Sequence, residues 1–175
     1  MRSVDQVDRF ARATQSLQHG ERWRWIHCAS VGEYEQALPV IQELKRLGHP
    51  VLLTAFSPSL WEVLEKNPPP WAHGSDVVLA LPEDRPRALQ RFIAAGDARI
   101  AWCALVKYEV WPELIAQLSS SKVPIHLFAA HVVKGALPTR WWAFTHRKAW
   151  RSLASVKVQD VASVERLNAI GVSAE

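Results

Sequence analysis

The chain has 175 residues, of which 49% are hydrophobic and 22% charged, with a formal net charge of +4 at pH 7. This balance is typical of one globular domain with a proper core, and it excludes intrinsic disorder, collagen and coiled coil. No run of residues approaches the roughly 18 to 20 apolar residues of a membrane-spanning helix, and the N-terminal segment lacks the apolar core of a signal peptide. We therefore expect a single domain over residues 1–175, with peripheral membrane contact at most.

Short apolar runs alternate with helical patterns along the chain. The predicted strands cover residues 23–29, 50–56, 75–81, 99–106, 124–130 and 155–159. The predicted helices cover residues 32–48, 60–66, 85–94, 112–120, part of 138–153, and 161–170. Six strand–helix repeats predict an α/β fold, a Rossmann-like doubly wound parallel sheet of about six strands. The Pro-rich segment 67–76 is short enough to be a loop inside that domain.

The two cysteines, Cys28 and Cys103, both lie in apolar predicted strands. This placement favours small buried hydrophobic residues over a disulfide framework or a metal site. A reducing compartment follows from that interpretation.

Two carboxylates follow predicted strands that we expect to be neighbours. In open parallel sheets, ligands bind outside the carboxyl ends of the strands, where the strand order reverses. With the common order 3-2-1-4-5-6, the reversal lies between the first and fourth strands. Glu33 follows the first and Glu109 the fourth, so both are predicted to flank one crevice.

Glu33 has two interpretations. Ser30 and Glu33 have the spacing of a capping box, in which the carboxylate serves the start of a helix. Alternatively, Gly32 lets a substrate approach the backbone, the free amides favour an anion, and the Glu33 carboxylate accepts a proton from a sugar hydroxyl.

The other candidate loops are equally ambiguous. Lys107 and Glu109 fit a solvated surface pair, or a functional set in which Glu109 orients a hydroxyl and Lys107 holds an anionic group. Ser57 and Ser59 follow the second strand. Helix capping explains Ser57, and the alternative interpretation is that these hydroxyls face a ligand.

Basic and aromatic side chains alternate between residues 134 and 151. They are Lys134, Arg140, Trp141, Trp142, Phe144, His146, Arg147, Lys148, Trp150 and Arg151. Such a segment suits an anionic, partly apolar surface such as a phospholipid membrane, a phosphorylated lipid or a nucleic acid. An amphipathic helix with a solvated basic face is the structural alternative.

Several motifs together resemble the 3-deoxy-D-manno-octulosonic acid (Kdo) transferases of lipopolysaccharide biosynthesis. They are WIHCASVGEYEQALPVI, LLTAFSPS, LPEDRPRALQRF, LVKYEVWPEL, VPIHLFAA and VKVQDVASVERLNAIGV, in family order from about Trp25 to Val172. The SVGE turn and the YEVWP segment are the most specific of these.

The resemblance implies one half of a GT-B glycosyltransferase, the N-terminal acceptor-binding domain. It implies that Kdo passes from CMP-Kdo to a lipid A precursor (lipid IVA) with inversion, and that CMP-Kdo binds a C-terminal domain absent from this chain. We therefore expect this half to be inactive alone. The resemblance also implies work at the cytoplasmic face of the inner membrane, in peripheral contact with it. It implies no cofactor and no metal, because one base suffices and cytidylate is a good leaving group.

Carried onto matching positions, Glu33 is implied to be the catalytic base and Glu109 the second catalytic glutamate. Ser30 and Gly32 belong to the base-bearing turn, and Ser57 and Ser59 to a hydroxyl loop that faces the acceptor. Many members have Glu-Thr-Glu where this chain has residues 107–109, so Lys107 cannot take over a carboxylate's role. Lys134 ends the loop that corresponds to an arginine-containing, phosphate-binding loop.

The rival hypothesis is a stand-alone Rossmann-like module that binds a nucleotide or phosphorylated ligand without catalysis, with Glu33 as a cap only. The chain has no G-x-G-x-x-G loop or P-loop after its first strand, which counts against that hypothesis. Nucleic-acid binding rests only on the positive charge, and we expect no nucleic-acid partner.

Overall fold

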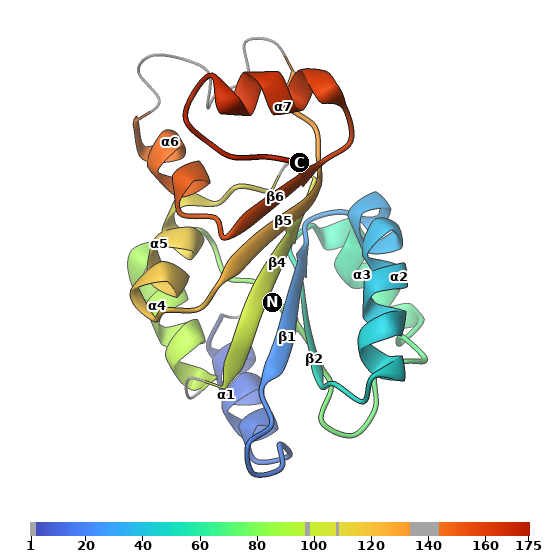
Figure 1. Cartoon of the computed structure of the whole chain (residues 1–175). Coiled ribbons are helices and arrows are strands. Elements are labelled where there is room, and N and C mark those ends of the chain that lie inside the picture. The colour runs from blue at the N-terminus through green and yellow to red at the C-terminus, as the bar shows by residue number, and fades with distance from the viewer. Residues whose placement is uncertain (1–2, 97–98, 108, 134–143) are drawn as a thin grey trace.

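A computed structural model describes residues 3–96, 99–107, 109–133 and 144–175 of the chain (Figure 1). The strands are β1 (Trp23–Cys28), β2 (Val51–Ala55), β3 (Val77–Ala80), β4 (Ile100–Val106), β5 (Ile125–Ala130) and β6 (Ser155–Val158). The helices are α1 (Ser3–Thr14), α2 (Val31–Arg46), α3 (Pro58–Lys66), α4 (Pro86–Ala95), α5 (Pro112–Ser120), α6 (Phe144–Arg151) and α7 (Val161–Asn168). The predicted helix within 138–153 thus corresponds to α6, and residues 138–143 lie outside the described part.

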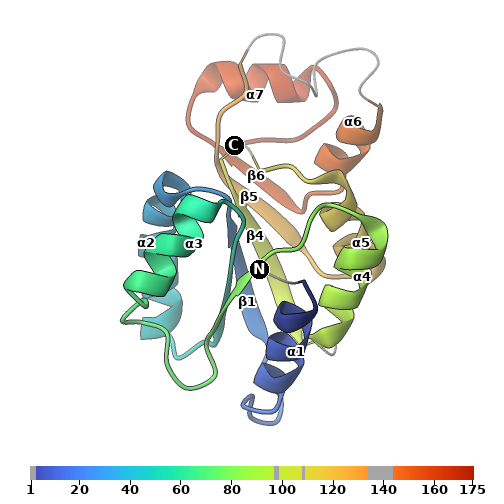
Figure 2. The same ribbon diagram turned by 180° about the vertical axis from the view of Figure 1, so that it is seen from behind.

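The six strands form one parallel sheet in the order β3-β2-β1-β4-β5-β6. Helices α2 and α3 cover one face, and α1, α4, α5 and α6 cover the other (Figures 1 and 2). The predicted α/β fold and strand order are both confirmed. Because β1 and β4 are paired, with His27 opposite Leu105, their carboxyl ends lie side by side at the centre of the sheet.

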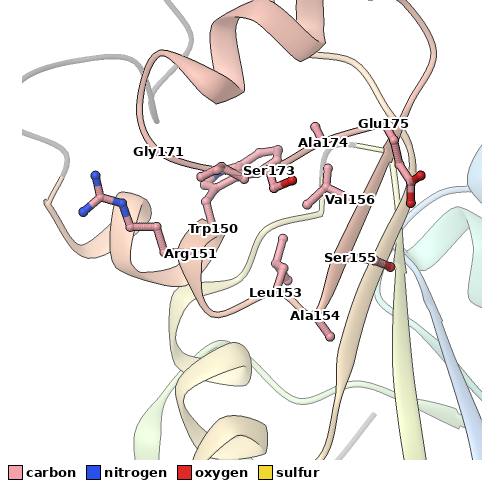
Figure 3. A pocket seen from close by; sticks show the side chains of 11 residues that line it. Trp150, Arg151, Leu153, Ala154, Ser155, Val156, Gly171, Ser173, Ala174 and Glu175 are labelled. Carbon is pink, nitrogen blue, oxygen red and sulfur yellow. The ribbon is translucent and has the colours of Figure 1, made fainter.

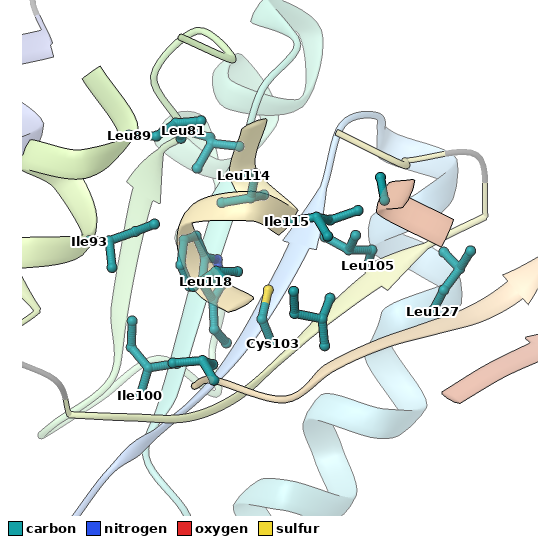
Figure 4. Packing of buried hydrophobic residues seen from close by; sticks show 14 of the residues in the cluster. Leu81, Leu89, Ile93, Ile100, Cys103, Leu105, Leu114, Ile115, Leu118 and Leu127 are labelled. Atoms are coloured by element: carbon teal, nitrogen blue, oxygen red, sulfur yellow. The ribbon is translucent and has the colours of Figure 1, made fainter. Parts of the chain in front are cut away.

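Each face of the sheet has its own apolar cluster, because successive side chains of a strand point to opposite faces. In β1, Trp23 and Trp25 belong to the larger cluster, while Ile26 and Cys28 belong to the cluster under α2 and α3. Figure 4 shows part of the larger cluster, where residues of α4 and α5 pack over Cys103 and its neighbours. A sheet buried on both faces explains why its strands are almost wholly apolar.

Both cysteines are free and buried, as predicted. Cys28 belongs to the cluster under α2 and α3, and Cys103 to the larger cluster on the opposite face. The sheet therefore separates the two thiols.

Helix α1 was missed by the sequence analysis. Its Phe10 is fully buried, with ring centroids 5.2 Å from Trp23 and 5.0 Å from Phe92. The Gln6 side chain accepts a hydrogen bond from the Ala80 amide at 2.9 Å. These contacts are to residues distant in the chain, so the helix is stabilised chiefly by tertiary packing.

Residues 67–76 form the predicted loop, which connects α3 to β3 of the same sheet. The Asp76 carboxylate accepts hydrogen bonds from the Val51 amide at 2.8 Å and the His73 amide at 3.1 Å, and lies 2.6 Å from Lys45 Nζ. Asp76 thereby fixes the end of this loop against the start of β2.

Helices α3, α4 and α5 all begin with proline, which has no N–H to leave unsatisfied at the first helical position. Helix α3 is capped by Ser57, but Trp111 at the N-cap of α5 makes no side-chain capping bond. The Asp84 carboxylate takes that role, accepting from the Leu114 amide at 2.9 Å and the Glu113 amide at 3.3 Å. The loop after β3 thus holds the start of α5.

Replacing Asp84 by Ala should lower the free energy of unfolding by about 1 kcal/mol, because two amides at the start of α5 lose their acceptor. Urea denaturation measures the change. Glu83→Ala is the matched control, since the Glu83 carboxylate forms an ion pair with exposed Arg85, and it should change stability by less than about 0.5 kcal/mol. Equal effects of both substitutions would contradict this role of Asp84.

Candidate active site

The SVGE turn forms a complete capping box at the start of α2. Oε2 of Glu33 accepts hydrogen bonds from the Ala29 amide at 2.6 Å and the Ser30 amide at 3.3 Å. The Ser30 hydroxyl in turn accepts from the Glu33 amide at 3.4 Å. The capping interpretation of Glu33 is therefore confirmed, and its side chain is held in place in the first turn of α2.

The geometry nevertheless leaves part of the Glu33 carboxylate available. Both hydrogen bonds use Oε2, and within the described residues Oε1 accepts none. A carboxylate oxygen has two lone pairs, so Oε1 can accept a further proton donor while Oε2 keeps the cap. Capping and proton acceptance are compatible in this conformation.

Gly32 lies in the first turn of α2 and has open space around it. A Cβ atom built there has no heavy atom within 4 Å, and its φ is outside the left-handed region. Backbone strain therefore does not explain a glycine at this position, and the open space agrees with the predicted close approach of a substrate.

Glu109 follows β4, as predicted, and its carboxylate accepts a hydrogen bond from Nε1 of Trp111. Partial burial raises the pKa of Glu109, the Trp111 bond opposes that shift, and the Glu33 carboxylate adds to it. Burial, then the charges of Glu33 and Glu109, raises the pKa of the Cys28 thiol at the end of β1. The two carboxylates thus lie within electrostatic range of each other, as the strand order predicts.

Lys107 begins the loop that carries Glu109. Its φ is 64°, a left-handed conformation that is uncommon for residues other than glycine, and its amide donates to the Phe128 carbonyl at 2.9 Å. This left-handed residue turns the chain out of β4. Lys134, the other predicted basic binding residue, lies outside the described residues.

The hydroxyl loop after β2 lies beside the SVGE turn. The Ser57 amide donates to the Ala29 carbonyl at 3.0 Å, which joins the two loops directly. Ser57 Oγ accepts from the Leu60 amide at 3.2 Å and lies 3.1 Å from Ser59 Oγ. The capping interpretation of Ser57 is therefore confirmed, and the exposed Ser59 hydroxyl lies within hydrogen-bonding distance of the Ser57 hydroxyl.

An aromatic group borders the carboxylates, and the sequence analysis did not find it. The Trp111 ring packs edge-to-face on His27, with centroids 5.2 Å apart, and on Phe56, with centroids 4.5 Å apart. Phe56 is 44% exposed, so it presents an apolar surface beside the site. The sequence signals were the YEVWP segment, which carries Trp111, and the LLTAFSPS segment, which carries Phe56.

His27 is fully buried and neutral. Burial lowers the pKa of His27 to about 3. Trp25 Nε1 donates to the Thr54 hydroxyl at 2.8 Å, and that hydroxyl lies 2.9 Å from His27 Nδ1. Because a hydroxyl oxygen has two lone pairs and one proton, Thr54 can accept from Trp25 and also either donate to Nδ1 or accept from it. Nε2 is buried and has no hydrogen-bond partner within the described residues.

The loop after β5 is tied to α7. His131 Nδ1 lies 2.7 Å from Asp160, which caps α7 through the Ser163 amide at 2.8 Å. Arg166 donates to the Val132 carbonyl at 2.6 Å. This network fixes the residues that precede Lys134.

The largest cavities that the described residues form lie away from the turn, and two of them adjoin segments discussed above. One of about 460 Å³ is next to Phe56, between α1, α4 and the carboxyl ends of β2 and β3. The other, of about 530 Å³, lies between the end of α6, β6 and residues 171–175 (Figure 3). None of the predicted site residues lines either cavity.

The described residues contain no group of three or more His, Cys, Asp or Glu side chains arranged to hold a metal ion. Across the same residues, no helix combines the length and apolar character needed to cross a membrane.

Comparison with known proteins identifies relatives. The sequence model of a family described as "3-Deoxy-D-manno-octulosonic-acid transferase (kdotransferase)" matches residues 6–175. A 3-deoxy-D-manno-octulosonic acid transferase of Aquifex aeolicus is 33% identical over 70% of this chain and 32% of its own length. Transferases of the same name from Bordetella pertussis and Haemophilus influenzae are 32% and 27% identical, each over 86% of this chain and 35% of their own length. The chain thus spans about a third of the length of these curated relatives.

Gly32→Ala should leave the free energy of unfolding unchanged or raise it by up to about 1 kcal/mol, because the new methyl group enters open space in a helix. Gly96→Ala is the contrasting control. Its Cβ would lie 2.7 Å from the Phe10 ring, and the overlap should cost about 1 to 3 kcal/mol. Chemical denaturation measures both. A large loss of stability in Gly32→Ala would show that this glycine is needed for folding.

Stability should rise with pH between about 3 and 6.5 through His27. In the unfolded chain the imidazole binds a proton below its ordinary pKa of about 6.5, whereas the folded state binds it only near 3, so acid favours unfolding. The contribution is at most about 1.4 kcal/mol per pH unit. His27→Gln should show a shallower pH dependence in urea denaturation, while His19→Gln, at an exposed position, should match the original chain. Identical curves for His27→Gln and the original chain would contradict the assignment.

Proposed function

Because the chain belongs to the 3-deoxy-D-manno-octulosonic-acid transferase family, we propose that it is the acceptor-binding half of an inverting glycosyltransferase of lipopolysaccharide biosynthesis. The acceptor is a lipid A precursor, lipid IVA, and the donor is CMP-Kdo. The observation that carries the proposal is the pair of carboxylates, Glu33 and Glu109, at the carboxyl ends of the two strands between which the strand order reverses.

Glu33 is the general base. Its Oε1 takes the proton of the acceptor hydroxyl while that oxygen attacks the anomeric carbon of Kdo. The bond from this carbon to the phosphate oxygen of CMP breaks, CMP leaves with the electron pair, and the anomeric configuration inverts. Oε2 meanwhile keeps its bonds to the Ala29 and Ser30 amides, so the base does not have to leave the cap to react.

Glu109 and the surrounding polar groups bind the acceptor. The Glu109 carboxylate accepts a hydrogen bond from a hydroxyl of the acceptor sugar, and Lys107 and Lys134 attract the phosphate groups of the acceptor. Ser57 and Ser59 supply hydroxyls beside the turn, and Gly32 leaves room for the sugar. Cytidylate is a good leaving group, so the displacement needs no cofactor, and these residues need not bind a metal ion.

CMP-Kdo is assigned to a second, C-terminal domain, since the chain spans about a third of the length of its relatives. The lipid acceptor requires work at a membrane, which we place at the cytoplasmic face of the inner membrane. Phe144 is 69% exposed at the start of α6, and Lys148 is exposed on the same helix. An apolar residue next to basic ones favours peripheral contact with anionic lipid.

Glu33→Gln tests the base. In a protein where this chain is followed by a donor-binding domain, turnover should fall by about 100-fold to 10,000-fold, because an amide cannot accept the hydroxyl proton. Stability should fall by at most about 1 to 2 kcal/mol, since the amide oxygen can still serve the cap. Glu35→Gln, on the exposed side of the same helix, is the matched control and should keep full turnover. Unchanged turnover in Glu33→Gln would exclude Glu33 as the base.

Ligand binding to the chain alone separates an acceptor half from a nucleotide module. A soluble bisphosphorylated lipid A precursor analogue should shift the NMR amide signals of residues 30–33, 57–59 and 107–109. CMP should leave them in place. Shifts with CMP alone, or with neither ligand, would overturn the acceptor assignment.

A further inference from the structure

Trp111 is the N-cap residue of α5, but its side chain makes no capping hydrogen bond to that helix. N-cap residues are usually Ser, Thr, Asp or Asn, because their side chains accept a hydrogen bond from the first turn. Trp111 is the N-cap of α5 and makes no such bond, and Asp84 from another loop caps the helix instead. Asp84 thus accepts the hydrogen bonds of the first-turn amides of α5, and the indole of Trp111 contacts other residues.

The indole is directed at Glu109. Its Nε1, which can only donate, forms a hydrogen bond to Oε2 of that carboxylate. Glu109 is only two residues earlier and sits on a loop rather than on a strand or helix. Without this bond, the described residues offer its carboxylate no other hydrogen bond, and repulsion from Glu33 would favour turning it away.

Two ring contacts fix the indole itself. It packs against His27 of β1, which is fully buried and lies within hydrogen-bonding distance of Thr54, and against Phe56, which directly follows β2. Both contacts are edge-to-face, with interplanar angles of 83°, a favourable arrangement for aromatic rings. The orientation of the Glu109 carboxylate is therefore set by two strands of the sheet, acting through one side chain.

We propose that Trp111 is a positioning residue for the transfer reaction, whose indole N–H holds the Glu109 carboxylate beside Glu33 in the orientation that receives the acceptor. This inference rests on the proposed function. Among the described residues, Glu33 on α2 and Cys28 on β1 interact electrostatically with Glu109, His27 on β1 contacts Trp111, and Lys107 precedes Glu109 on the same loop.

Trp111→Phe removes the N–H donor and keeps an aromatic ring to pack on His27 and Phe56. In the two-domain protein, kcat should fall by about 10-fold to 100-fold, because a displaced carboxylate no longer orients the acceptor. Trp102→Phe is the matched control. Trp102 also packs edge-to-face on a histidine, His126, with centroids 6.0 Å apart, but near the start of β4 and away from the carboxylates. It should keep full turnover.

Two further measurements separate positioning from a structural role. Carboxyl-carbon NMR of the 175-residue chain should show the pKa of Glu109 raised in Trp111→Phe and unchanged in Trp102→Phe, because the indole bond favours the charged carboxylate. The double variant Trp111→Phe, Glu109→Gln should be no slower than Glu109→Gln alone, since Trp111 acts through Glu109.

The possible outcomes are distinct. An unchanged Glu109 pKa in Trp111→Phe, or rate losses that multiply in the double variant, would overturn the positioning role. If Glu33→Gln nevertheless abolishes turnover, only this inference fails and the proposed function stands. If Glu33→Gln leaves turnover unchanged, the proposed function itself fails, whatever Trp111 does.

Discussion

The pairing of β1 with β4 is the contact on which the candidate site depends. These strands are separated by more than 70 residues in the chain, yet they are hydrogen-bonded neighbours at the centre of the sheet. Because both are parallel, the chain leaves them at the same edge. That single pairing brings the turn with Glu33 and the loop with Glu109 together, and no local feature of either segment requires it.

Glu33 shows how one carboxylate can serve folding and chemistry together. Its Oε2 satisfies two amides at the start of α2, and its Oε1 accepts no bond within the described residues. The capping bonds fix the side chain, so the base that we propose needs no separate residue to orient it. The cap and the proposed base are alternatives in the sequence, and the structure leaves a different carboxylate oxygen for each.

The rest of the site is held by contacts between elements. Ser57 donates to Ala29 and so binds the loop after β2 to the SVGE turn, and Asp84 holds the start of α5 from the loop after β3. The site is thus assembled from the ends of the four strands β1 to β4. Phe56 adds an exposed apolar surface beside the site, which suits the lipid acceptor that we propose.

Local patterns predicted much of this molecule. The periodicity of apolar residues predicted the fold, and the Ser30–Glu33 spacing predicted the capping box. Helix α1 was missed because its apolar Phe10 is stabilised by Trp23 and Phe92, residues remote in the chain. The residue-by-residue roles of Ser30, Gly32, Ser57, Ser59, Lys107 and Lys134 in binding remain predictions.

The sequence by itself determined the α/β fold, the family and the placement of the two carboxylates after predicted strands, because each is carried by local periodicity or by short contiguous motifs. The common strand order was assumed, and the tertiary structure established it. Only the tertiary structure decided that Glu33 keeps one oxygen available. It also decided that Asp84 rather than Trp111 caps α5, and that Trp111 joins buried His27 to Glu109. The contacts of Asp84 with α5 and of Trp111 with His27 join residues that lie far apart in the chain, so a local sequence pattern cannot predict them.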